Sequence, residues 1–368
     1  MLSFAIAFIA SLLVTLLIVH YDHLHEHLSS DTDLGGVQKF HAKPVPRIGG
    51  VGILCGLIVS SAELMISYPH VSAGIFLVTL CGMPAFLSGM AEDLTKRVTP
   101  LARLVCTMAA ALATYWVVGA AVTRISVPWF DAALSIPLIS CVITVFAVAA
   151  LANAVNIIDG FNGLASMVAM MMFASLAYVA FQVSDPVVLS GSLIMMGAIL
   201  GFFIWNFPAG LIFLGDGGAY FVGFMLGELA ILLVMRNPGV SAWYPVLLFM
   251  YPIFETCFSI YRKKFIRGIS PGVPDGVHLH MLVYKRLMRW AVGSHAAREI
   301  TRRNSLTSPY LWLLCMVAVV PATLFWRHTL HLFIFVVVFI VSYVWLYMSI
   351  VRFKVPRWMV IHKSRRRS

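Results

Sequence analysis

Charge is the property that this sequence has least of. Charged residues make up 11% of the 368 positions and apolar residues 61%, against about 25% and about 45–50% in ordinary soluble domains. Acidic residues are scarcest, 15 against 26 Lys and Arg, so the formal net charge is +11. Uncharged stretches of about 20 residues, the length that crosses bilayer hydrocarbon, follow one another along the chain. This composition excludes an ordinary soluble domain and predicts an all-α polytopic membrane protein.

Cysteine chemistry is also missing. The six cysteines lie in apolar runs, without CxxC spacing or neighbouring histidines, so neither disulfides nor a zinc site is indicated. The first apolar run, Leu2 to Val19, lacks a basic leader and a small-residue cleavage site, so we expect a retained helix. No repeat or linker divides the chain. We expect one catalytic membrane domain, 1–368, with 262–308 as a cytoplasmic loop subdomain and 352–368 as a basic cytoplasmic tail.

Eleven apolar runs are expected to form transmembrane helices. They span residues 2–19, 48–68, 71–90, 101–119, 133–152, 163–182, 187–205, 218–235, 242–261, 309–326 and 329–351. Lys and Arg are retained on the cytoplasmic side of membrane proteins. If the N-terminus is periplasmic, only Arg124, Arg236 and Arg327 among the 26 basic residues fall outside. The C-terminus is then cytoplasmic, and its basic tail is expected to face anionic lipid rather than nucleic acid.

Polar motifs gather in segments that this orientation places at the cytoplasmic face. They lie at 41–50, 92–100, 153–163, 206–218 and 275–280, each ahead of an even-numbered predicted helix. Helix N-termini present unpaired N–H groups and the positive end of the helix dipole, so several together suit phosphate. Glycines in these segments would let the backbone approach a ligand closely; they are Gly160, Gly163, Gly215, Gly217 and Gly218.

Four carboxylates lie beside these predicted helix starts: Glu92, Asp93, Asp159 and Asp216. A carboxylate repels phosphate unless a divalent cation lies between them, and Mg²⁺ binds one or two carboxylates together with water and phosphate oxygens. Phosphoryl transfer is mainly positioning and charge neutralisation. The set therefore predicts a phosphoryl-transfer site that uses Mg²⁺, with Mn²⁺ as the other option. Any single one of these residues could instead be a helix N-cap.

Other ionisable residues leave alternatives open. His278 and His280 could contact phosphate or sugar, bind a metal whose third ligand the sequence does not show, or be solvated loop residues. Glu63, Glu228 and Glu255 lie in predicted spans, where an ionisable residue is a functional candidate by default. Glu228 and Glu255 could each line a polar cleft or pair with another helix.

Three motifs carry a resemblance to a known family. KPVPRIGG at 43–50, NAVNIIDGFNGL at 153–164 and NFPAGLIFLGDGG at 206–218 resemble, in order, the polyprenyl-phosphate N-acetylhexosamine-1-phosphate transferases, a group of glycosyltransferase family 4. With the matching helix order, the likeness covers nearly the whole chain. The motif PDGVHLH, at 274–280, is more similar to the WecA- and WbpL-like branch than to the related MraY enzymes.

The resemblance implies roles for individual residues. Asp216 and Asp159 are expected to bind the metal, and Asp93, Asp159 and Asp216, with Glu92, to form the catalytic group. The expected substrate-binding residues are Lys43, Arg47, Lys96, Asn153, Asn156, Asn206, His278 and His280. Two positions depart from the family pattern, since Glu92 replaces an aspartate and Met281 replaces a further histidine.

The resemblance predicts transfer of N-acetylhexosamine 1-phosphate from a UDP-sugar, such as UDP-GlcNAc, to undecaprenyl phosphate at the bacterial inner membrane. The products would be undecaprenyl-diphosphate-sugar and UMP, and the step would initiate O-antigen or related surface polysaccharide. The expected partners are these two substrates and membrane lipid, without nucleic acid, and the assembly could be a homodimer.

Four other functions compete with this one. A MraY-like phospho-MurNAc-pentapeptide transferase would share the motifs, and a member that has lost activity would share the fold. A lipid or sugar transporter would also suit eleven spans, but transporters place ionisable groups near the midplane of paired repeats. An intramembrane aspartyl protease would need glycine where Phe213 stands.

Overall fold

The computed structural model describes residues 1–23, 44–270, 276–288 and 297–352, and over these ranges the chain is helical without a β-strand. Nine helices of the described part are long and apolar enough to cross a membrane. They are α1 (Leu2–His20), α3 (Gly49–Ser67), α6 (Pro100–Val117), α8 (Pro137–Ile158), α9 (Leu164–Gln182), α10 (Pro186–Asn206), α11 (Gly215–Arg236), α16 (Ala297–Leu324) and α17 (Thr329–Val351). The all-α polytopic prediction is confirmed.

Two predicted spans are broken helices. The span predicted at 71–90 consists of α4 (Pro69–Cys81) and α5 (Met83–Thr95), which meet at a bend of 44°. The span predicted at 242–261 consists of α12 (Trp243–Leu248) and α13 (Met250–Tyr261). Proline causes both breaks, because Pro84 and Pro252 lack the N–H that would bond four residues back.

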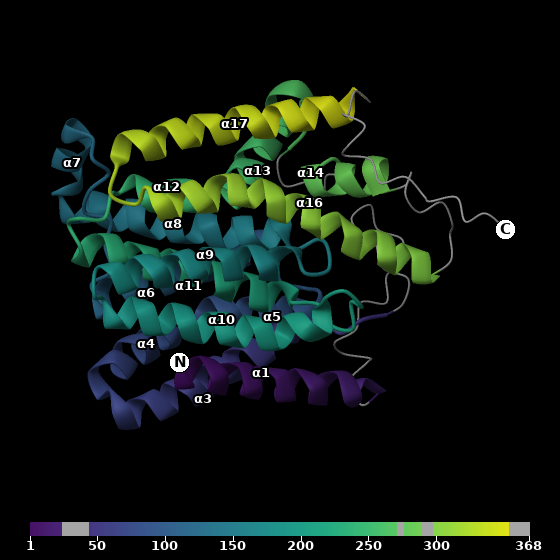
Figure 1. Ribbon diagram of the computed structural model, residues 1–368, viewed down its shortest axis with the longest axis horizontal. Helices are drawn as coiled ribbons and strands as arrows, with labels where there is room; N and C mark the ends of the chain where they lie inside the picture. The colour runs from purple at the N-terminus through teal and green to yellow at the C-terminus, as the bar shows by residue number, and fades with distance from the viewer. Residues whose placement is uncertain (24–43, 271–275, 289–296, 353–368) are drawn as a thin grey trace.

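The α12–α13 segment carries the chain back along the bundle, from the left end of Figure 1, where α11 ends, to the right end, where α16 begins. Its two helices have 6 and 12 residues, so neither is long enough to cross a membrane alone, whereas α4 and α5 together form a broken span. The count of eleven spans therefore stays a prediction.

The helix predicted at 309–326 begins earlier, at Ala297, so that Pro309 lies inside α16. Polar contacts explain the extension. The Asn304 side chain accepts a hydrogen bond from the Asn162 N–H at 2.8 Å, and the Ser308 hydroxyl donates to the Asn162 carbonyl at 2.6 Å. The first part of α16 thus lies within the predicted loop subdomain 262–308, and it projects beyond its neighbours at the right of Figure 1.

Short elements close the two ends of the bundle. Helix α7 (Pro128–Leu134) lies at the left end of Figure 1, and α14 (Leu279–Leu282) at the right end. Two π-helical turns, η1 (Arg262–Ile266) and η2 (Val283–Met288), flank the segment that contains α14. The right end is therefore the more elaborate of the two.

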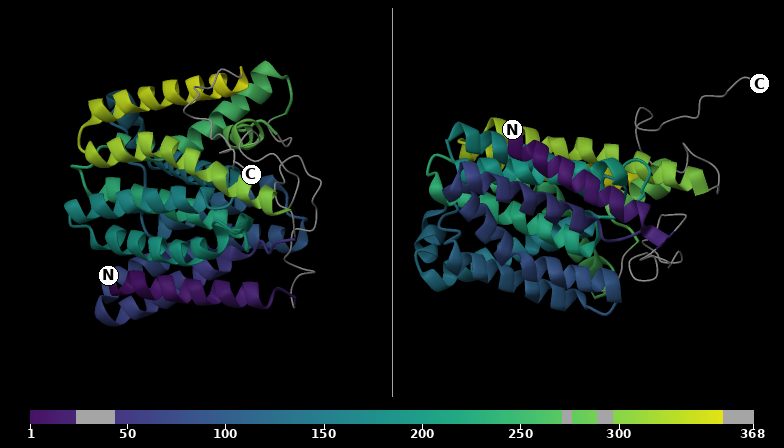
Figure 2. Two further views of the ribbon diagram at one scale, coloured as in Figure 1. Left: turned by 45° about the vertical axis from the view of Figure 1, so that its right-hand side comes forward. Right: turned by 90° about the horizontal axis from the view of Figure 1, so that it is seen from below.

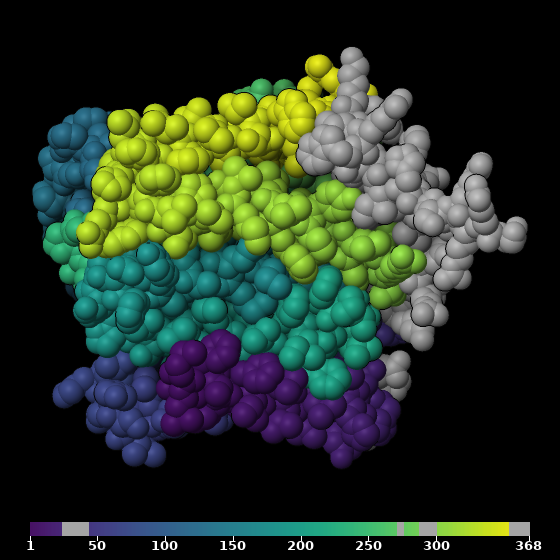
Figure 3. Space-filling model, viewed as in Figure 1, coloured from purple at the N-terminus to yellow at the C-terminus, as the bar shows by residue number. Residues whose placement is uncertain are grey.

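Helix α11 is the centre of the bundle, buried along almost its whole length. Figures 1 and 3 show α1, α10, α16 and α17 on one face, and Figure 2 shows α6 on the opposite face. Glycines permit close packing at the start of α11: a Cβ on Gly50 would lie 2.5 Å from the Gly218 Cα, and one on Gly89 2.5 Å from the Asp216 carbonyl carbon. We expected Gly217 and Gly218 to face a ligand, but the structure packs them against α5 and α3.

Candidate active site

The candidate site lies at the right end of Figure 1, where α11 begins. Asp93 of α5 is fully buried there, and its carboxylate accepts hydrogen bonds from the N–H groups of Asp216 and Gly217, at 3.0 and 2.9 Å. Asp93 thus caps the N-terminus of α11 from a neighbouring helix. The expectation that these N–H groups would receive a substrate phosphate is wrong in this structure, because Asp93 occupies them.

Asp216 is the residue on which the site converges. Its carboxylate lies 3.4 Å from the Arg47 guanidinium, also pairs with Arg103 of α6, and accepts a hydrogen bond from the Asn156 amide of α8 at 3.0 Å. The Asp216 side chain is 12% exposed, so these groups replace most of its hydration. Arg47 also approaches Asp93, at 3.6 Å. Two arginines and two aspartates from four segments thus form one charge cluster.

Backbone pairing fixes the segment that carries Arg47. The Phe213 N–H donates to the Pro46 carbonyl at 2.8 Å, and the Gly49 N–H donates to the Phe213 carbonyl at 3.0 Å. Gly215 has φ +75°, and a Cβ there would overlap the Arg47 carbonyl. The predicted motifs 43–50 and 206–218 are therefore joined directly, although residues 51–205 lie between them in the sequence.

Asp159 follows the last residue of α8 and is half-buried. Burial raises its pKa to about 7; the Arg47 charge opposes this shift and the Asp93 charge adds to it. The side chain is thus poised between its neutral and charged forms near neutral pH, as expected of a general base. The loop that follows is fixed by Asn206, whose side chain accepts from the Gly163 N–H at 2.6 Å and donates to the Ile212 carbonyl at 2.8 Å.

The histidine motif also reaches this end. His278 pairs through Nδ1 with Glu255 of α13, at 2.9 Å. His280 is 1% exposed and lies edge-on to the Phe161 ring at 5.6 Å, and neither of its ring nitrogens has a hydrogen-bond partner among the described residues. Burial lowers the pKa of His280 to about 3, so the ring is neutral. A Cβ on Gly160 would lie 3.3 Å from His280 Nε2, which places the imidazole beside the Asp159–Gly160 turn.

Other predicted site residues have different surroundings. Glu92 accepts from the Val98 N–H at 2.8 Å, so its carboxylate closes the turn after α5. Lys96 is exposed, in a left-handed conformation at φ 56°. Asn206 uses both amide atoms within the protein. Lys43 lies outside the described residues.

Two residues of the site, Arg103 and Tyr220, were not predicted. Arg103 pairs with Asp216 and lies 5.7 Å from the centre of the Tyr220 ring, whose hydroxyl donates to the Asn153 side chain at 3.1 Å. Arg103 was counted only as a topology signal. Its position five residues after Val98, at the start of an apolar helix that follows the polar motif 92–100, was the available clue.

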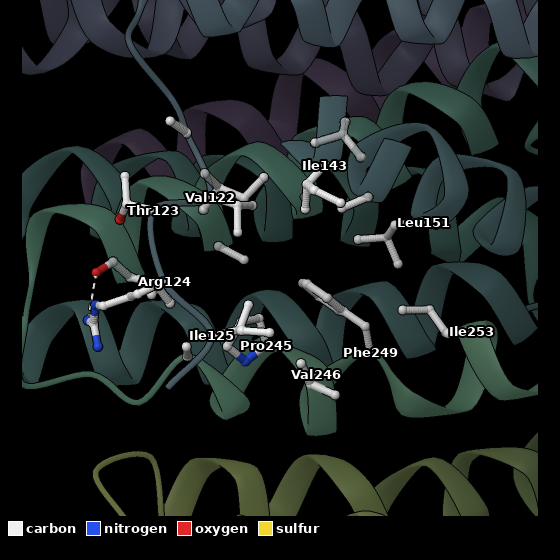
Figure 4. Close-up of a pocket in the computed structure, with 18 residues that line it drawn as sticks. Val122, Thr123, Arg124, Ile125, Ile143, Leu151, Pro245, Val246, Phe249 and Ile253 are labelled. Atoms are coloured by element: carbon white, nitrogen blue, oxygen red, sulfur yellow. Dashed lines mark hydrogen bonds between the residues drawn. The ribbon is translucent and has the colours of Figure 1, made fainter. Parts of the chain in front are cut away.

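An apolar pocket of about 230 Å³ lies among α8, α11, α12 and α13 (Figure 4). Its lining includes Leu151, which precedes Asn153 by two residues, and Ile253 of α13. At its other end lies Arg124, in the segment between α6 and α7. The pocket therefore lies beside the C-terminal half of α11, away from the charged cluster at the start of that helix.

The donors present fit a hard divalent cation. Asp216 and Asp159 supply carboxylate oxygens at one end of the bundle, and no group of three or more His, Cys, Asp or Glu side chains that could hold a metal occurs among the described residues. That donor set suits Mg²⁺, which uses one or two carboxylates and completes its shell with water and phosphate oxygens. It does not suit a closed zinc site.

Comparison with known proteins points to one family. Residues 75–234 match the model of glycosyl transferase family 4. Over these residues the chain is similar to this family. A Bacillus subtilis member described as a probable undecaprenyl-phosphate N-acetylglucosaminyl 1-phosphate transferase is 25% identical over 287 residues, or 76% of this chain and 77% of that protein.

Two further relatives are similar to this chain. The Thermotoga maritima undecaprenyl-phosphate alpha-N-acetylglucosaminyl 1-phosphate transferase is 26% identical over 265 residues, or 69% of this chain and 72% of that protein. A Bacillus thuringiensis phospho-N-acetylmuramoyl-pentapeptide-transferase is 26% identical over 207 residues, or 53% of this chain and 64% of that enzyme.

Proposed function

We propose that this protein transfers N-acetylhexosamine 1-phosphate from a UDP-sugar to undecaprenyl phosphate. The observation that carries the proposal is the cluster at the start of α11, where Asp93 and Asp216 meet Arg47 and Arg103. Such a cluster offers cations for a diphosphate and carboxylates for a metal and a proton. The named activities of the relatives support the same reaction class.

The reaction is a displacement at phosphorus. A phosphate oxygen of undecaprenyl phosphate attacks the β-phosphorus of the UDP-sugar, and the bond from that phosphorus to the bridging oxygen breaks. UMP leaves with the electron pair of that bond, and undecaprenyl-diphosphate-sugar is formed. The barrier falls mainly through positioning and charge neutralisation.

Each group of the cluster has a part in this displacement. Arg47 and Arg103 exchange their contacts with Asp216 for contacts with the donor diphosphate. Asp159, with its pKa near 7, accepts a proton from the lipid phosphate. Asp93 keeps the first turn of α11, and with it Asp216, in place through its two hydrogen bonds.

Mg²⁺, or Mn²⁺, is part of the proposal. Asp216 is the residue that would hold it, while Asp159, the other expected ligand, serves as the proton acceptor. When bound, the ion would neutralise the diphosphate of the donor. The cations of Arg47 and Arg103 already offset the two aspartates, so the site accepts an anionic substrate only when further positive charge balances it.

The membrane orientation of the site follows from the distribution of basic residues along the sequence. We place this end at the cytoplasmic face of the bacterial inner membrane, because Lys and Arg of the sequence concentrate there.

The donor is a UDP-N-acetylhexosamine, UDP-GlcNAc in first place. The relatives named as N-acetylglucosaminyl 1-phosphate transferases cover 76% and 69% of this chain, whereas the pentapeptide transferase covers 53%. The lipid-linked product would start O-antigen or a related surface polysaccharide.

Product analysis tests the proposal. Purified protein is incubated with undecaprenyl phosphate, Mg²⁺ and, in separate reactions, UDP-GlcNAc, UDP-GalNAc or UDP-MurNAc-pentapeptide. We expect UMP and undecaprenyl-diphosphate-sugar with a UDP-N-acetylhexosamine. UMP with the pentapeptide donor alone would assign the MraY-like reaction instead. Release of UDP, or release that does not need the lipid, would contradict sugar-phosphate transfer.

A further inference from the structure

Glu255 is a buried carboxylate that joins three parts of the chain. It is fully buried on α13, and it accepts hydrogen bonds from the Tyr343 hydroxyl at 2.7 Å and from the Leu279 N–H at 3.2 Å. His278 Nδ1 lies 2.9 Å from the same carboxylate. Since Tyr343 belongs to α17 and His278 to the histidine motif, Glu255 connects the C-terminal helix to that motif.

The connection continues toward the catalytic turn. The rings of His278 and His280 are parallel, 3° apart in plane, with centres separated by 5.3 Å. His280 in turn lies against Phe161 and Gly160. A continuous series of contacts therefore runs from Tyr343 through Glu255 and the two histidines to the turn that carries Asp159.

The last turns of α17 hold the same segment at two more points. The Tyr347 hydroxyl donates to the Val277 carbonyl at 3.3 Å, before the histidines. The Arg286 guanidinium, after them, donates to the Ile350 carbonyl at 2.8 Å and to the Val351 carbonyl at 2.5 Å. Both sides of the histidine motif are thus attached to α17.

His280 is the end of the series that lies beside the Asp159–Gly160 turn. Its ring is buried, yet neither nitrogen has a partner within the part of the chain that the structure describes, and a buried polar group without a partner is costly. A bound substrate can supply the missing partner. Buried polar networks whose members are all bonded make their surroundings rigid, and the Glu255 carboxylate has three donors around it.

We infer that Glu255 and Tyr343 are positioning residues, which fix the histidine motif so that His280 meets the phosphate or sugar of the donor. The expected effect on catalysis rests on the proposed function, whereas the expected connection between Glu255, Tyr343 and the histidine motif does not. Glu255 and Tyr343 do not touch substrate themselves. They act through His278, and they give α17, at the C-terminal end of the described chain, a part in catalysis.

Two substitutions test this role. Tyr343→Phe removes one hydroxyl and keeps the ring that packs on Phe254 and Phe258, and Glu255→Gln removes the charge and keeps the volume. Tyr115→Phe is the matched control, since it removes a hydroxyl that donates to the Pro137 carbonyl at the opposite end of the bundle. All variants are prepared in lipid nanodiscs and compared with wild type at equal amounts of folded protein.

The first readout needs no activity. The Leu279 N–H donates to Glu255, so amide hydrogen exchange of a peptide covering 276–284 reports on the connection directly. We expect faster exchange in Glu255→Gln and, to a smaller extent, in Tyr343→Phe, with wild-type exchange in Tyr115→Phe. Unchanged exchange in both test variants would overturn the inference, whatever reaction the protein performs.

The second readout is kinetic. Misplacing a group in an active site by a fraction of an ångström to 1 Å costs up to about hundredfold in rate, so we expect kcat to fall about tenfold in Tyr343→Phe and further in Glu255→Gln. KM for undecaprenyl phosphate should change less than kcat, and Glu255→Asp should recover part of the rate. Faster exchange with wild-type kcat would also overturn the inference. If wild type itself transfers no sugar phosphate, the proposed function fails, while the exchange result still decides the structural connection.

Discussion

Charged side chains cap both ends of α11, yet only one end carries the groups expected of a catalytic site. At the C-terminal end, the Arg124 guanidinium donates to the carbonyls of Val234, Asn237 and Val240, at 3.0, 3.1 and 2.8 Å. At the N-terminal end, Asp93 accepts from two N–H groups. Each charge complements the helix dipole and satisfies backbone groups that the helix leaves unpaired.

The difference lies in what surrounds each cap. One guanidinium nitrogen of Arg124 donates to three carbonyls, and the neighbouring pocket is apolar. At the N-terminal end, the cap is joined by Asp216, two arginines and the Asn156 amide. None of these additional groups is needed to cap a helix. The additional charged side chains therefore distinguish the candidate active site from a helix end that is only capped.

Of the changes that compare the two helix ends, removing the charge of the N-terminal cap should have the largest effect. Asp93→Asn keeps the size of the side chain but can accept through only one atom, so one of the two N–H groups loses its partner and Arg47 loses an anion. We expect kcat to fall by about hundredfold or more, in line with the loss of one oriented charge from a catalytic centre. The measurement is UMP release at saturating substrates; a kcat within threefold of wild type would contradict the role given to Asp93.

The pH dependence of the N-terminal end should be the next largest effect. Burial raises the pKa of Asp159 to about 7, so the carboxyl is neutral below that pH and cannot accept a proton. The rate should rise with pH through 7, by about tenfold per unit well below it. The Asp159→Asn variant should lose this rise, and a wild-type profile that is flat from pH 6 to 8 would contradict the assignment of Asp159 as base.

The same pKa shift has a consequence for stability. A carboxyl whose pKa is higher in the folded than in the unfolded protein favours folding most when it is protonated, below about pH 4. That contribution is lost as pH rises through 7. Asp159→Asn should therefore flatten the stability profile between these limits, as measured by thermal unfolding in detergent.

Removing the C-terminal cap should change stability and leave catalysis intact. Arg124→Gln removes hydrogen bonds that the charged guanidinium donates to backbone carbonyls, each worth about 1.5–3 kcal/mol. It leaves carbonyls at the end of α11 without these donors in largely apolar surroundings. We expect a lower unfolding temperature, with kcat per folded molecule unchanged. A fall in kcat as large as that of Asp93→Asn would remove the distinction between the two ends.

The smallest effect is expected from Glu92, the neighbour of Asp93. Its carboxylate accepts only from the Val98 N–H and contacts neither Asp216 nor the arginines in any recorded hydrogen bond or ion pair of the described chain. Glu92→Gln keeps an acceptor for that N–H, so kcat should stay within about threefold of wild type. A loss like that of Asp93→Asn would show that both carboxylates serve catalysis.

Hydropathy and the residue types of the loops predicted much of the fold and of the charge cluster from the sequence. Apolar length identified the helices, and the acidic residues between them identified the cluster, because charged groups are rare in a membrane chain and need a reason. Asp93, Asp216, Arg47 and Asn156 were predicted on separate segments, and the structure brings their side chains together. Proline positions could also have indicated the breaks at Gly82 and Phe249.

Contacts between distant helices could not be predicted in this way. Arg103 was read as a topology residue because its pairing with Asp216 depends on how α6 packs beside α11. Glu255 was left between two alternatives, and the structure shows that it pairs with the histidine motif and α17. Asn206 looked like a substrate ligand, whereas its amide joins two loops. The type of a residue indicates the chemistry that it can perform, but the residue with which it pairs depends on how the helices pack.

The central claim is that the start of α11 is built for sugar-phosphate transfer and that Asp216 is its essential carboxylate. The most direct measurement is UMP release that depends on undecaprenyl phosphate and Mg²⁺, compared between wild type and Asp216→Asn with matched unfolding temperatures. The account predicts loss of at least about a thousandfold in kcat for the variant with its fold retained. Release of UMP by Asp216→Asn at a rate near that of wild type would contradict it.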